Sequence, residues 1–114
     1  MRKHGIDSFL SFWIAIETLA MDDTDIRPIN ETLARVYQVS VQEASKQFGV
    51  GRVFGLRSKI VHHGHIASIH AKLKLYLEAL YSDLLFAELN LPSEYKTKSM
   101  LNDPEFDLMS YITC

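Results

Sequence analysis

The chain has 114 residues, of which 47% are hydrophobic and 23% charged, and its formal net charge is −2. These values favour one soluble globular domain with its own buried core, and they exclude a chain that is polycationic along its whole length. No apolar run is long enough to span a bilayer, so we expect no membrane association. The single cysteine, Cys114, can form no internal disulfide, which is typical of a reducing compartment and predicts a cytoplasmic protein.

The apolar residues recur at helical spacing almost throughout, which predicts an all-α fold. The N-terminal stretch has the basic-then-apolar order of a signal peptide. Glu17 interrupts it and no cleavage site of small residues follows, so a helix of the mature domain is expected from Ser8 to Met21. Its inner stripe comprises Phe9, Phe12, Trp13, Ile16, Leu19 and Ala20. A second helix is expected over 30–39.

The middle of the chain is expected to contain a third helix, preceded by a helical start or a kink. Ser40 followed by Glu43 has the form of a capping box and predicts a new helical start or a kink. The next helix is expected from Arg52 to about His63, with Gly64 as its C-terminal cap.

The longest helix is expected from about Ile66 to Leu89. Its core stripe steps by three and four residues through Ile66, Ile69, Leu73, Leu77, Leu80 and Leu84. A second apolar line, Leu75, Ala79 and Phe86, needs a partner, which is either another helix of this domain or a second copy of the chain. We therefore expect a helical bundle over 1–92. A tail over 93–114 packs on it, with one short helix that begins near Asp103-Pro104-Glu105.

Charge is polarised along the chain. No Asp or Glu lies between Glu43 and Glu78. The same interval holds Lys46, Arg52, Arg57, Lys59, Lys72 and Lys74, together with His62, His63, His65 and His70. Any one of these lysines is adequately explained as a solvated side chain. Together they predict a basic face on an acidic protein, and such a face attracts phosphate.

Arg57 lies on the apolar stripe of its predicted helix. A guanidinium in that position must find a partner, because an unpaired buried charge is costly. Glu17 poses the matching problem, since its helical neighbours are also apolar. A Glu17–Arg57 pair resolves both and gives Arg57 a purely structural explanation. It does not exclude function, because a carboxylate can also hold an arginine in position for catalysis.

His62 follows Arg57 by five residues, near the expected helix C-terminus. The carbonyl end of a helix favours imidazolium, and a histidine there suits acid–base catalysis or simply caps the carbonyls. Five residues turn a helix by about 140°, so the two side chains do not share one face. Two copies related by a two-fold axis would bring both pairs to one cleft. The histidines match no standard zinc spacing, so we expect no metal and no cofactor.

Two segments resemble the HEPN superfamily, most closely its ApeA-like branch: WIAIETL at 13–19 and LRSKIVHHG at 56–64. The resemblance runs from about Phe9 to Leu89. It implies an antiparallel bundle of four to five helices that forms a two-fold homodimer. Active members of this family are metal-independent endoribonucleases whose arginine and histidine line a cleft shared by two protomers. Many serve in toxin–antitoxin or antiviral defence systems, with an antitoxin or a sensor domain as a further partner.

Carried over to this chain, the resemblance makes Arg57 and His62 the catalytic pair and Glu17 the residue that positions Arg57. Ser58, Lys59 and His63 become the substrate-binding candidates. RNA is the implied substrate, cut by attack of its 2′-hydroxyl. Ser58 stands where many active members have Asn, Asp or His. Two alternatives therefore stay open: a non-catalytic HEPN domain that binds nucleotides or mediates dimerisation, and a plain helical dimerisation domain.

Overall fold

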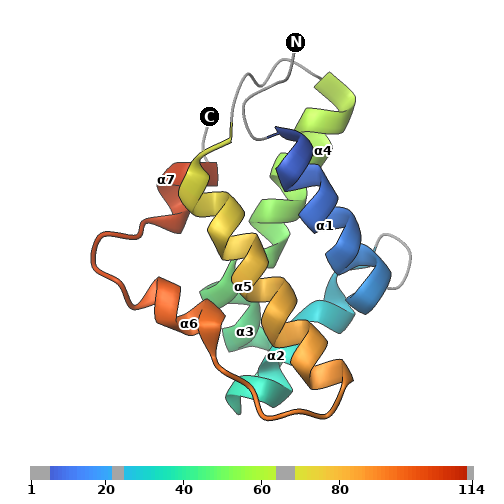
Figure 1. Ribbon diagram of the computed structural model, residues 1–114, viewed down its shortest axis with the longest axis vertical. Coiled ribbons are helices and arrows are strands. Elements are labelled where there is room, and N and C mark those ends of the chain that lie inside the picture. The colour runs from blue at the N-terminus through green and yellow to red at the C-terminus, as the bar shows by residue number, and fades with distance from the viewer. Residues whose placement is uncertain (1–5, 22–24, 64–68, 113–114) are drawn as a thin grey trace.

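The computed structural model describes residues 6–21, 25–63 and 69–112, with His63 described for its backbone alone. The helices in these ranges are α1 (Ile6–Ala20), α2 (Arg27–Tyr37), α3 (Val41–Phe48), α4 (Val50–His63), α5 (Ala71–Glu88), α6 (Lys96–Leu101) and α7 (Leu108–Ile112). The all-α prediction is thus confirmed for the described residues. α5 packs most extensively against α1 on one side and α6 on the other, while α2 and α3 pair with each other (Figure 1).

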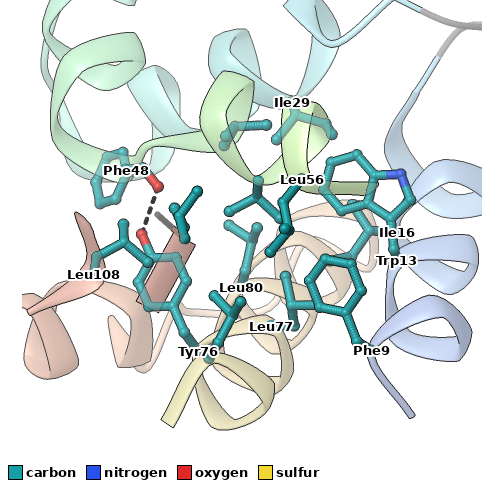
Figure 2. Close-up of a cluster of buried hydrophobic side chains, with 14 of the residues drawn as sticks. Phe9, Trp13, Ile16, Ile29, Phe48, Leu56, Tyr76, Leu77, Leu80 and Leu108 are labelled. Carbon is teal, nitrogen blue, oxygen red and sulfur yellow. Dashed lines mark hydrogen bonds between the residues drawn. The ribbon is translucent and has the colours of Figure 1, made fainter. Parts of the chain in front are cut away.

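The core forms where the apolar sides of several helices meet. α1 contributes Phe9, Trp13 and Ile16, all fully buried, whereas Phe12 and Leu19 at the edges of the predicted stripe are only partly buried. Side chains from α2, α3, α4, α5 and α7 belong to the same cluster (Figure 2). Burial of this apolar surface is the main force that holds α1 against α4 and α5.

Helix starts depend on local polar contacts. The predicted capping box at Ser40 is confirmed as the start of α3, because the Ser40 hydroxyl accepts a hydrogen bond from the Glu43 amide at 3.1 Å. α4 begins at Val50, slightly before the expected Arg52, because Gly49 adopts a left-handed conformation (φ 62°) between α3 and α4. With this earlier start, Arg57 and His62 still lie within α4, as expected.

α5 is shorter than expected at its N-terminus. It begins at Ala71, because the imidazole of His70 caps it: Nδ1 accepts a hydrogen bond from the Lys72 amide at 3.0 Å. The prediction that Ile69 and His70 are helical is therefore wrong. The expected cap Gly64 and the expected start at Ile66 lie outside the described residues.

The tail over 93–114 contains α6 and α7, which pack on α5. The short last helix expected in the tail is present as α7, but the start expected near 103–105 is wrong, because α7 begins at Leu108. Asp103 instead forms a turn in which its Oδ1 accepts a hydrogen bond from the Glu105 amide at 3.0 Å, and side chain–backbone bonds of this kind compete with helix formation. α6 begins earlier because buried Asp83 on α5 accepts hydrogen bonds from the amides of Lys96 (3.1 Å) and Thr97 (3.0 Å).

Candidate functional site

The predicted contact between Glu17 and Arg57 is present. Arg57 Nη2 lies 4.0 Å from Glu17 Oε2, and the two side chains keep 28% and 23% of their surface exposed. α1 supplies the acid near its C-terminal end and α4 supplies the arginine near its middle. The separation is long for an ion pair and both groups are partly solvated, so their attraction is weak. The arginine is therefore held at the surface and remains accessible to an anion.

Two aromatic rings lie beneath this ion pair. Arg57 Cζ lies 5.9 Å from the centre of the Phe54 ring, which in turn lies 5.9 Å from the ring of Trp13. Trp13 precedes Glu17 by four residues on α1, and Phe54 precedes Arg57 by three on α4. Each helix thus contributes one aromatic residue and one charged residue from the same side. Sequence reasoning missed Phe54, although its spacing from Arg57 was a usable signal.

His62 is exposed and lies on a different side of α4. The helical turn from Arg57 to His62 is about 140°, so the two side chains of one chain diverge. Within a single copy, the structure does not bring the predicted catalytic pair to one point.

The three predicted substrate-binding residues have different surroundings. Ser58 is half-buried next to Arg57. Lys59 is exposed and lies about 200° around α4 from Arg57, on the far side of that helix. The side chain of His63 lies outside the described residues. Of the two whose side chains are described, Ser58 lies closer to Arg57 around the helix, at about 100°.

Apolar side chains lie exposed next to the ion pair. Ile14, which precedes Glu17 by three residues, is 59% exposed, and Val61, four residues after Arg57, is 53% exposed. We call the surface formed by Ile14, Glu17, Phe54, Arg57 and Val61 the α1–α4 face. Its two helices have opposite charge, because α1 contains acids but no lysine or arginine and α4 contains cations but no acid.

Two other basic residues of the segment, Lys72 and His70, have different surroundings. Lys72 lies along a groove of about 700 Å³ on the outer side of α5, which also exposes Leu75. Ala79 of the same apolar line is buried, and α6 packs against α5 on this side. His70 is occupied by its capping bond and by stacking on Tyr111 of α7, with ring centres 4.0 Å apart. Neither Lys72 nor His70 therefore belongs to the α1–α4 face.

The described ranges contain no group of three histidine, cysteine, aspartate or glutamate side chains arranged to hold a metal ion. Among the helices of these same residues, none has the length and apolar character that crossing a bilayer requires. No protein-family model matches the chain, and neither the curated proteins nor the solved structures contain a match.

Proposed function

We propose that this chain is a HEPN-type, metal-independent endoribonuclease of the ApeA-like branch, and that it works as a two-fold dimer. The observation that carries the proposal is the partly exposed Arg57 beside Glu17, five residues before His62 on the same helix. A partly solvated guanidinium with a weak protein partner can exchange that partner for phosphate. The family resemblance of residues 13–19 and 56–64 agrees with this arrangement of α1 and α4.

The proposed reaction uses only groups of the protein and the RNA. The 2′-hydroxyl of a ribose attacks the adjacent phosphorus while the imidazole of His62 takes its proton. The P–O5′ bond breaks and the leaving 5′ oxygen takes up a proton from water, while the imidazolium of His62 returns its proton to the solvent. The products carry a 2′,3′-cyclic phosphate and a 5′-hydroxyl. Arg57 stabilises the negative charge that grows on the non-bridging oxygens. DNA is not cut, because it lacks the attacking hydroxyl.

Dimerisation supplies what one copy lacks. Arg57 and His62 diverge on α4, so one phosphodiester meets both groups only when a second chain contributes one of them. The α1–α4 face suits a two-fold contact, in which acidic α1 of each copy lies against basic α4 of the other. Such a contact would cover Ile14 and Val61, which are exposed in the single chain.

The proposal also covers the helical bundle, the contacts with RNA, the cellular location and the controlling partner. Four to five of the helices form the antiparallel bundle typical of HEPN domains, and Ser58, Lys59 and His63 contact the RNA backbone. The enzyme acts in the cytoplasm in a toxin–antitoxin or antiviral defence system. An antitoxin or a sensor domain controls its activity.

Cleavage of RNA in EDTA tests the proposal. The wild-type protein is expected to cut, and His62→Ala and Arg57→Ala are each expected to lower the rate at least about 100-fold, a typical loss for a general acid–base or charge-stabilising group. Arg35→Ala is the matched control, because Arg35 is an exposed arginine of α2 outside the α1–α4 face. Cleavage by the wild type that His62→Ala does not reduce would refute the assigned mechanism.

A non-catalytic HEPN domain that binds nucleotides or mediates dimerisation is the second candidate. Ser58, half-buried beside Arg57, favours it, because a hydroxyl there can hydrogen-bond a phosphate without assisting proton transfer. Calorimetric titration with nucleoside mono-, di- and triphosphates separates the two candidates. Saturable binding that Arg57→Ala abolishes, together with no cleavage of RNA, would support this second function.

A further inference from the structure

We infer that Phe54 is a positioning residue that fixes the orientation of the Arg57 guanidinium, and that Trp13 fixes Phe54 in turn. The chemical meaning of this inference rests on the proposed ribonuclease function, in which Arg57 must face the phosphate oxygens. The restraint of the Arg57 side chain by Phe54 can be measured without any cleavage of RNA.

The ion pair alone is a poor orienting device. Glu17 and Arg57 approach only to 4.0 Å through one oxygen and one nitrogen, and both side chains keep about a quarter of their surface exposed. Two parallel hydrogen bonds to a carboxylate fix the orientation of a planar guanidinium, and a single contact of this length provides no such pair of bonds. Glu17 thus sets the charge balance around Arg57 and leaves its plane free to rotate.

The Phe54 ring supplies the missing restraint. Long side chains on a helix lean toward its N-terminus, so Arg57 reaches back over the turn that carries Phe54. The distance of 5.9 Å from Arg57 Cζ to the ring centre lies within the range in which the ring face attracts a cation. The guanidinium therefore has an aromatic ring within attractive range on its own helix, which favours orientations that keep the cation over that ring.

Phe54 is itself held by the core. Its ring lies 5.9 Å from that of Trp13 at an interplanar angle of 42°, and Trp13 is fully buried. Trp13 sits in the main hydrophobic cluster, so its ring cannot move without disturbing α1 (Figure 2). A continuous series of contacts thus runs from the rigid core through Phe54 to the reactive cation.

NMR of the Arg57 side chain tests the inference directly. The Arg57 Nε–Hε signal, assigned by its loss in Arg57→Lys, is expected to show a ring-current shift and a higher heteronuclear NOE than the signal of exposed Arg52 on the same helix. In Phe54→Leu both differences should vanish, and in Phe54→Tyr both should persist. Phe12→Leu is the matched control, because Phe12 is also partly buried but lies along the groove on the outer side of α5.

The cleavage assay gives the second readout. Phe54→Leu is expected to lower kcat about two- to fivefold with KM unchanged, the range that an exposed cation–π contact provides, while Phe54→Tyr restores the rate. An Arg57 signal in the wild type as unshifted and mobile as that of Arg52 would overturn the inference, even if no Phe54 variant folds. An equal change in Phe12→Leu would overturn it as well. A wild-type protein that cuts no RNA would refute the proposed function, and the NMR comparison would still decide the role of Phe54.

Discussion

Replacing Arg57 by alanine distinguishes a ribonuclease from a helical scaffold in which Glu17 and Arg57 are only a structural pair. Two charges 4 Å apart attract by about 1 kcal/mol in water and by about 4 kcal/mol near a protein surface. Both side chains here are roughly a quarter exposed, and partly solvated pairs of this kind contribute only about 0.2–1 kcal/mol. Loss of the largely buried methylene groups of Arg57 adds about 1–2 kcal/mol.

We therefore expect Arg57→Ala to lower the free energy of unfolding by about 1–3 kcal/mol, well below the 5–15 kcal/mol typical of a domain. The variant should stay folded and lose ribonuclease activity. Urea denaturation followed by circular dichroism measures the change, and a double-mutant cycle with Glu17→Gln isolates the pair, with an expected coupling below about 1 kcal/mol. A variant that is unfolded at 25 °C, or a coupling of 3 kcal/mol or more, would refute this reasoning and favour a structural pair.

Three further predictions follow from other contacts. Ile14→Asp should weaken the proposed dimer at least about 100-fold, because each two-fold contact loses two buried isoleucines. Leu89→Asp should not weaken it, because Leu89 is equally exposed but distant from the α1–α4 face. Light scattering across a dilution series measures dimerisation of both variants. Asp83→Ala should lower the free energy of unfolding by about 3 kcal/mol or more in urea denaturation, because it leaves the amides of α6 and the Tyr37 hydroxyl without their acceptor. Burial, together with the hydrogen bond to Asp83, raises the pKa of Tyr37 well above its usual value, so its contribution to stability is complete below about pH 10 and is lost as pH rises further. Alkaline denaturation followed by circular dichroism should show that decline, and Tyr37→Phe should reduce the slope; an unchanged slope would contradict it.

The amphipathic spacing of the sequence predicted much of the fold. The burial of Trp13 and Ile16 in α1 and of Leu73 and Leu80 in α5 follows from apolar residues recurring at helical spacing, which local sequence contains. The contact between Glu17 and Arg57 was also predictable, because each charge lay on an apolar stripe and needed a partner. In both cases the decisive information lay within a few residues along one helix.

Elements determined by contacts between distant residues could not be predicted in this way. α6 begins at Lys96 because Asp83, thirteen residues earlier, accepts the hydrogen bond of its first amide, and the sequence around 93–98 contains no sign of that partner. His70 was grouped with the other histidines as a cation. In the fold its Nδ1 accepts the hydrogen bond that caps α5. Charge type along the sequence does not indicate which polar side chains tertiary contacts will occupy.

The difference between polar side chains that tertiary contacts occupy and those that stay accessible also explains why the functional proposal rests on Arg57. Among the basic residues of the segment, His70 caps α5 and Lys72 lies along the groove beyond α5, whereas Arg57 combines a long contact to Glu17 with a ring beneath it and open surface above it. A guanidinium needed only for stability would gain more from a short bidentate contact with its carboxylate. The separation of 4.0 Å leaves its nitrogens free to donate to phosphate oxygens, and the exposed Ile14 and Val61 mark the surface over which a second chain would enclose that phosphate.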